Sequence, residues 1–209
     1  MPWSHMIKIP FKITLENFSY FSSSIFIGIN TITNLDFINP FYSISIALWI
    51  KGVPAIGLIE APELGERYVA ILGKGAYLIN IASKKKMKAR VSSVRALSQS
   101  YIVTCEGGDQ AELLVKNFSK LYPRVKDMRK LGSAAIELAW VGLGRAEVYI
   151  TPLANIWDIG AGILFVTEAG GKVLDFHQKP LLYAKVLKNQ KTDLIAINKK
   201  LKLPRIFIR

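Results

Sequence analysis

The sequence contains a single cysteine, Cys105, among 209 residues. One thiol cannot form a disulfide within the chain, so the composition fits a reducing compartment, and we expect a cytoplasmic protein. A catalytic thiol would need a histidine close to it, and the chain offers only His5 and His177. We therefore interpret Cys105 as a small buried residue rather than a nucleophile.

Long apolar runs are also missing. The longest covers residues 44–59, and Lys51, Gly52 and Pro54 interrupt it. It is shorter than the ~20 residues that a membrane-spanning helix requires, and it fits two strands and a turn better. The N-terminal stretch has no uninterrupted signal-peptide core either. We expect no membrane span and no secretion.

Acidic residues are scarce: 15 Asp and Glu stand against 28 Lys and Arg, which gives a net charge of +13. The excess is concentrated in residues 84–90 and 185–209. Such charge attracts nucleic acids or phosphorylated metabolites, although a solvated basic surface without a specific partner explains it equally well. No RNA-binding sheet motif, zinc finger or basic zipper accompanies the charge, which disfavours nucleic acid.

What is present is a globular composition, with 51% apolar and 21% charged residues. No repeat or linker divides the chain, so we expect one unit over residues 1–209. Its character changes near Ser98. Residues 1–97 are mainly strand-forming, whereas in residues 98–209 strands and helices alternate.

The first half has the alternation and β-branched residues of a meander. Strands are predicted at residues 42–49, 55–60, 67–72 and 77–79, with a turn at residues 52–54.

In the second half, apolar residues recur at helical spacing. Helices are predicted at residues 109–121, 133–141 and 157–169, and strands at 101–105, 147–150, 172–176 and 193–198. A meander followed by alternating helices and strands predicts a layered α/β protein with mixed sheets.

Several motifs share one resemblance. Residues 157–162 read WDIGAG, and residues 168–173 read EAGGKV. Residues 131–135 read LGSAA and are followed by Gly144 and Arg145, and residues 73–78 read GKGAYL. In this order and spacing the motifs resemble the inositol monophosphatase family.

The resemblance implies the family's alternating α-β-α-β-α sandwich, here N-terminally truncated, and Mg²⁺-dependent hydrolysis of sugar- or inositol-phosphate monoesters. It implies Asp158 as a metal ligand and Gly132, Ser133 and Ala134 as contacts to a phosphorylated small molecule. From the residues alone, Asp158 is a helix cap and Gly132-Ser133 a helix start. A chain without the family's N-terminal helices exposes apolar surface, so a homodimer is a further expectation.

The first metal-binding motif departs from the family pattern. There, two aspartates of an Asp-Pro-(Ile/Leu)-Asp-Gly-(Thr/Ser) segment bind the metal. Here Asn30 and Thr33 take their places, or Ile29 and Ile32 after a shift of one residue. Asp36 is the one acid in this stretch, and a turn role suits it better than metal ligation.

Four other residues and one segment have structural interpretations. Thr151 stands where many inositol-specific members have glutamate, and it either ends the strand over 147–150 or contacts substrate. Arg145 is interpreted as a surface or ion-pair residue, Trp157 as packing beside Asp158, residues 168–171 as a helix end, and His177 as a loop residue.

Three functions follow as alternatives. The first is a Mg²⁺-dependent phosphatase of impaired activity, because lost carboxylates remove charge from the metal site. The second is a catalytically inactive family member that acts in binding or assembly. The third is a basic module that binds nucleic acid or another polyanion through residues 84–90 and the C-terminal lysines.

Overall fold

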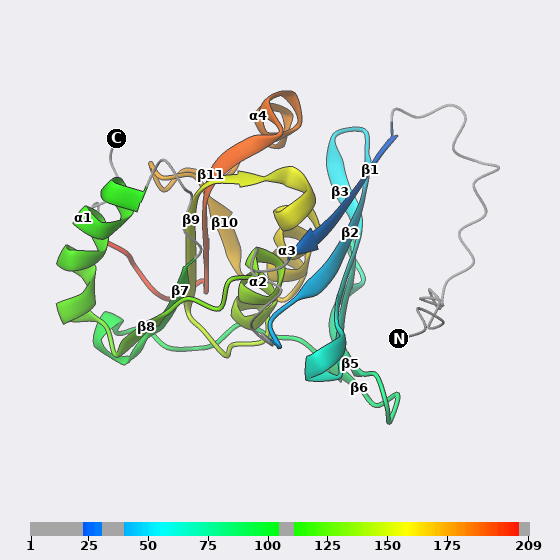
Figure 1. Ribbon diagram of the computed structural model, residues 1–209, viewed down its shortest axis with the longest axis horizontal. Coiled ribbons are helices and arrows are strands. Elements are labelled where there is room, and N and C mark those ends of the chain that lie inside the picture. The colour runs from blue at the N-terminus through cyan, green and yellow to red at the C-terminus, as the bar shows by residue number, and fades with distance from the viewer. Residues whose placement is uncertain (1–22, 31–39, 105–110, 205–209) are drawn as a thin grey trace.

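The computed structural model describes residues 23–30, 40–104 and 111–204. Two β-sheets enclose a middle layer of two helices, and a third helix lies beyond the second sheet (Figure 1). This arrangement is the layered α/β architecture that the sequence predicts. None of the helices in these ranges is long and apolar enough to cross a membrane.

The first sheet is a six-stranded antiparallel meander in which the strands follow each other in chain order. The side chains of β2 alternate between its faces, and Ala47 and Trp49 are buried against the helices with 1% exposure each. The strands are β1 (Ser23–Asn30), β2 (Ser43–Ile50), β3 (Val53–Ala61), β4 (Glu66–Ile71), β5 (Gly75–Asn80) and β6 (Lys86–Lys88).

The second sheet has five strands in the order β10-β11-β9-β7-β8. Strand β7 is parallel to both its neighbours, and the other pairs are antiparallel, so the sheet is mixed. The strands are β7 (Tyr101–Thr104), β8 (Asp127–Arg129), β9 (Val148–Asn155), β10 (Lys172–Leu174) and β11 (Lys191–Ile197).

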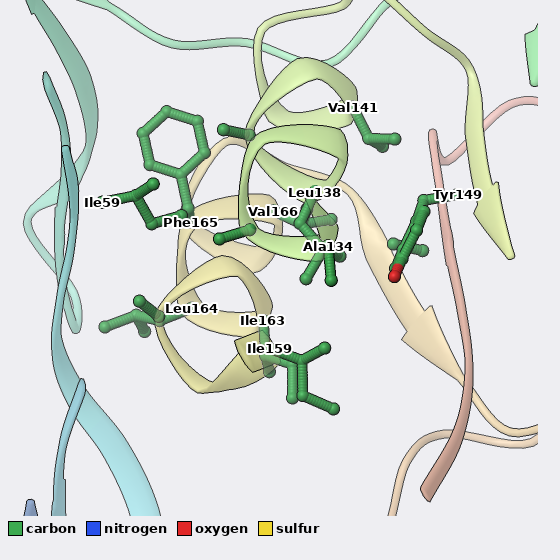
Figure 2. Packing of buried hydrophobic residues seen from close by; sticks show 14 of the residues in the cluster. Ile59, Ala134, Leu138, Val141, Tyr149, Ile159, Ile163, Leu164, Phe165 and Val166 are labelled. Atoms are coloured by element: carbon green, nitrogen blue, oxygen red, sulfur yellow. The ribbon is translucent and has the colours of Figure 1, made fainter. Parts of the chain in front are cut away.

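The helices α2 (Ala134–Gly142) and α3 (Ile156–Glu168) form the middle layer. Both are apolar on nearly every side because they are covered from both sheets. Figure 2 shows Ile59 of the first sheet on one side of them and Tyr149 of the second on the other. The remaining helices are α1 (Ala111–Leu121) and α4 (Tyr183–Asn189), with 3₁₀ turns at Pro62–Leu64, Leu97–Gln99 and Tyr122–Arg124.

Most predicted elements are confirmed to within a few residues, and two boundaries are wrong. The turn between the second and third strands is Lys51-Gly52, and Val53 and Pro54 already belong to β3. Thr151 does not end its strand, because β9 continues to Asn155.

Besides the 3₁₀ turns and β1, which precedes the predicted meander, three further elements were not predicted. The lysine run contains β6, an edge strand whose residues are all exposed, and edges of this kind commonly carry lysine. The lysine-rich C-terminal stretch overlaps α4, which ends at Asn189 and is followed by the C-cap residue Gln190 in a left-handed conformation with φ of 55°. The third is β8, which has only three residues. Cys105 and Asp109 lie outside the described residues.

Candidate functional site

The two helices of the middle layer run parallel to each other. A Cβ added at Gly162 would lie 2.5 Å from Leu138 Cδ1, and one added at Gly142 would lie 2.5 Å from Phe165 Cδ1. From the first contact to the second, the residue numbers rise in both helices, from 138 to 142 in α2 and from 162 to 165 in α3, so the two helices run in the same direction. One turn before the first contact lie Ala134 in α2 and Asp158 in α3, so the two helix starts, which carry predicted site residues, share one end of the layer.

Ser133 is the N-cap of α2. Its Oγ accepts a hydrogen bond from the backbone N–H of Ile136 at 3.5 Å and lies 2.9 Å from Ser43 Oγ. The side chain is fully buried, and Ala134 is 7% exposed. The cap predicted at this helix start is confirmed. Substrate contact by Gly132, Ser133 or Ala134 stays a prediction.

Glu137 is a buried acid that holds the loop in front of α2. Its Oε1 accepts hydrogen bonds from the N–H groups of Leu131, at 2.7 Å, and Gly132, at 3.3 Å. Its Oε2 has no hydrogen-bond partner among the described residues, and burial raises the pKa of Glu137 to about 8. Sequence reasoning missed this residue, although an acid inside the apolar run AAIELAW is a visible signal.

Asp158 lies in the first turn of α3 rather than at its cap. The helix begins at Ile156 with Asn155 at the N-cap position, so the interpretation of Asp158 as an ordinary cap is wrong. Its Oδ2 accepts a hydrogen bond from Asn155 Nδ2 at 3.1 Å. The carboxyl is half-buried, and this desolvation raises its pKa. A negative charge here faces the positive end of the helix dipole.

The C-terminal end of strand β1 lies near the start of α2. Asn30 is the last residue of β1 and is paired with Ser43, whose hydroxyl contacts Ser133. Asn30 therefore lies close to the start of α2, and its alignment with the family's first metal aspartate stays a prediction. Thr33 and Asp36 lie outside the described residues.

The described donors do not fit a magnesium site. Within the described ranges, no three or more His, Cys, Asp or Glu side chains gather as metal ligands. Asp158 contributes one carboxylate, whereas a hard divalent cation beside an anionic phosphate requires several oxygen ligands of high charge. We therefore derive no catalytic step through a metal.

Thr151 is a buried strand residue, with 2% exposure, and its hydroxyl donates to the carbonyl of Pro152 at 3.4 Å. Close by, Leu153 has a φ of 47°, and its N–H donates to Asp193 Oδ1 at 3.0 Å. Leucine seldom adopts this left-handed backbone conformation, and the hydrogen bond to Asp193 stabilises it at Leu153.

Glu168 joins two of the motifs that carry the family resemblance. It is the last residue of α3, as predicted for a helix end, and its carboxylate accepts the N–H groups of Gly73, at 2.9 Å, and Gly75, at 2.8 Å. The motif at residues 73–78 is thus tied to the end of the motif helix. The role that these contacts show is structural.

Arg145 forms a two-pronged ion pair with Glu66, with nitrogen–oxygen distances of 2.8 and 2.6 Å. Tyr68 also donates its hydroxyl hydrogen to Glu66. These hydrogen bonds lower the pKa of Glu66, while its burial opposes the shift. The ion-pair interpretation of Arg145 is confirmed. Trp157 packs on the main core and His177 lies in a turn, as predicted.

The fold and the site together define a class: a layered α/β protein in which two parallel helices begin at one polar end between two sheets. The model of the inositol monophosphatase family matches residues 30–202, and the chain belongs to that family. Among solved structures, a suhB suppressor protein from Bartonella henselae superposes with a TM-score of 0.75 at 29% identity, over 85% of this chain and 66% of that one.

Sequence relatives agree. This chain is 34% identical to Nus factor SuhB of Pasteurella multocida over 141 residues, which is 66% of this chain and 51% of the relative. It is 36% identical to a fructose-1,6-bisphosphatase/inositol-1-monophosphatase of Thermotoga maritima over 142 residues, 67% of this chain and 51% of the relative. The matched part thus spans about half the length of these relatives.

Proposed function

We propose that this chain binds a phosphorylated small molecule of the sugar- or inositol-phosphate class where α2 and α3 begin, and that Mg²⁺-dependent hydrolysis of the phosphate monoester is strongly impaired. The observation that carries the proposal is the parallel packing of α2 and α3. It places Gly132, Ser133 and Ala134 at the same end as Asp158.

Anion binding is supported by electrostatics. The first turns of both helices have backbone N–H groups that the helix itself does not use, and each helix start carries partial positive charge. Two such ends side by side favour a phosphate more than one does. The net charge of +13 adds a long-range attraction for anionic ligands.

Impairment of hydrolysis is supported by the donor set. Asn30 and Thr33, or Ile29 and Ile32 after a shift of one residue, stand in the sequence in place of the two aspartates of the family pattern, so neither register retains their two negative charges. Loss of one preorganised electrostatic group can already cost about 10²–10³ in rate in other enzymes. We expect turnover below that of a member with all its carboxylates by at least this factor.

A catalytically inactive binding or assembly protein is the second candidate. It is favoured by the same replacements and by the name Nus factor that the relatives from Pasteurella multocida and Xylella fastidiosa carry. In this case the chain acts by contacts to partners, including a second copy of itself. A cytoplasmic location, expected from the single cysteine, belongs to the same proposal.

The test is phosphate release from a panel of inositol and sugar phosphates, with and without Mg²⁺, for the native chain and Asp158→Asn. The matched control is Asp127→Asn on β8, a carboxylate whose partner is Arg129. Weak Mg²⁺-dependent release that Asp158→Asn abolishes and Asp127→Asn keeps supports the impaired phosphatase. Ligand binding without release supports the second candidate, and neither binding nor release refutes both.

A further inference from the structure

A cavity of about 250 Å³ lies where α4 leads into β11. Three stretches of chain form its walls: residue 153 in β9, several of residues 175–182 between β10 and α4, and several of residues 185–193 in α4 and β11. Figure 1 shows α4 at the end of the second sheet, where β11 begins. The candidate residues at the starts of α2 and α3 are not among these walls, so this is a different place from the proposed ligand site.

Two lysines line the cavity without an ion partner. Lys185 lies on α4 and Lys191 begins β11, and both residues are exposed. Neither forms an ion pair within the ranges that the structure describes. His177 lines the same cavity and adds a ring N–H donor. Unpaired ammonium groups beside a further donor favour an anionic group of a ligand, and lysine binds phosphate in this way as a point charge.

The carboxylates of the cavity are engaged by backbone N–H groups. Asp175 Oδ1 accepts from the N–H of Lys179 at 2.9 Å, and Asp193 Oδ1 accepts from the N–H of Leu153 at 3.0 Å. A carboxylate has about four acceptor sites, so Asp175 can also accept hydrogen bonds from hydroxyl groups of a ligand. The cavity therefore combines cations for an anionic group with an acceptor for hydroxyl groups.

The size of the cavity limits the ligand. Its volume of about 250 Å³ equals roughly eight water molecules at ~30 Å³ each. This is below the ~300 Å³ at which sites for drug-sized molecules begin. Phe176 and Leu181 give the cavity an apolar wall for a carbon skeleton. A molecule of the size of a sugar phosphate fits these walls, and a dinucleotide is too large.

The backbone around the cavity is strained. Leu153, Gln178 and Gln190 have φ values of 47°, 59° and 55°, and each lies in a wall or next to one. They are three of the five non-glycine residues with positive φ in the part of the chain that the structure describes. Such conformations cost energy and concentrate at functional sites, so their grouping here supports a binding role for this corner.

Gln190 also connects the cavity to α3. Its carbonyl accepts the N–H of Ile156, the first residue of that helix, at 2.9 Å. Asn155, just before the helix, donates to Asp158. A ligand that orders residues 189–193 should therefore stabilise the start of α3 as well.

We propose that this cavity is a second ligand site, which binds a small phosphorylated metabolite that carries hydroxyl groups. Lys185 and Lys191 hold its phosphate, and Asp175 accepts from its hydroxyl groups. Phe176 and Leu181 cover its carbon skeleton. This inference goes beyond the proposed function and does not rest on it, because the residues that carry it are different.

The test is two-dimensional amide NMR of the full chain, titrated with glucose 6-phosphate. The backbone signals of His177, Asn189 and Thr192 should shift, with a dissociation constant below ~1 mM. Glucose should leave these signals in place. Inorganic phosphate should shift them with an affinity at least ~10-fold weaker, because it lacks the hydroxyl contacts. Amide hydrogen exchange at Ile156 should slow when glucose 6-phosphate is added, and exchange in α1 should not change.

The variant Lys185→Gln/Lys191→Gln should raise the dissociation constant by at least ~10-fold, because it removes two charge-assisted contacts to the phosphate. Both residues are exposed, so the fold should tolerate the change. The control is Lys116→Gln/Lys120→Gln on α1, which removes the same two charges at exposed residues outside the cavity. It should bind glucose 6-phosphate with an unchanged dissociation constant.

Signals that stay in place up to ~10 mM glucose 6-phosphate refute the proposal. An equal loss of affinity in both lysine variants assigns the binding to net charge and also refutes it. Equal affinity for inorganic phosphate, or equal shifts with glucose, contradicts the ligand class. Shifts at Gly132 report on the start of α2 instead, so failure of this inference and failure of the proposed function are distinguishable in one titration.

Discussion

The parallel packing of α2 and α3 can be tested at Gly142. A methyl group added there would lie 2.5 Å from Phe165 Cδ1 and 2.7 Å from Cε1, far inside van der Waals contact. Phe165 is 1% exposed and packs edge-to-face on Tyr68, so its ring has little room to move. Overpacking of this kind costs about 1–3 kcal/mol, and the helix preference of alanine returns at most about 1 kcal/mol.

We therefore expect Gly142→Ala to lower the free energy of unfolding by about 2 kcal/mol, or roughly 4–8 °C in Tm for a chain of this size. In the background of Phe165→Ala, which alone costs about 3–5 kcal/mol, the same change should be neutral or stabilising by up to about 1 kcal/mol. Urea unfolding of the four proteins gives the coupling energy, expected to exceed about 1.5 kcal/mol. Equal costs of Gly142→Ala in both backgrounds would show that the ring does not lie on Gly142.

Three further outcomes are expected. Glu168→Gln should weaken the hydrogen bonds between residue 168 and the turn at Gly73, which destabilises the turn by about 1 kcal/mol. Amide hydrogen exchange should become faster in this turn and stay unchanged in α1. Burial raises the pKa of Glu137 in the folded protein from its ordinary 4.5 to about 8, so the folded state retains a proton that the unfolded state loses. Between these two pH values the free energy of unfolding should therefore fall as pH rises, by up to about 1.4 kcal/mol per pH unit. Glu137→Gln should flatten this pH dependence in urea unfolding curves, and an unchanged pH dependence contradicts the assignment. Arg145→Lys should cost about 1 kcal/mol or less, because the pair with Glu66 is partly exposed; a loss above about 3 kcal/mol would mean a buried role.

Local patterns were sufficient to predict most of the fold. The alternation around Ala47 and Trp49 predicts β2, and the helical spacing after Trp157 predicts α3. The elements that were missed are those that their neighbours stabilise. Lys86 and Lys88 have no strand preference of their own, and they are extended because β5 provides the pairing partner.

Less of the site could be predicted. The motif identifies Asp158 and Ser133 as positions of interest, and only the packing of α2 on α3 shows that they share one end. The roles of Glu137 and Glu168 depend on which backbone N–H groups lie near them. The N–H groups that Glu168 accepts belong to residues about 95 positions earlier in the chain, and a local sequence pattern contains no information about contacts at that separation.

The polar links between the first sheet and the later helices have a consequence for synthesis. The hydrogen-bond partners of Glu66, Gly73 and Ser43 lie 79 to 95 residues further along the chain and are therefore synthesised later. At ~5–20 residues per second the ribosome needs roughly 4–20 seconds to supply those partners. During this interval the nascent meander has its helix-binding face uncovered, so a chaperone that shields newly made strands should raise the yield of native protein more than it raises the stability of the finished fold.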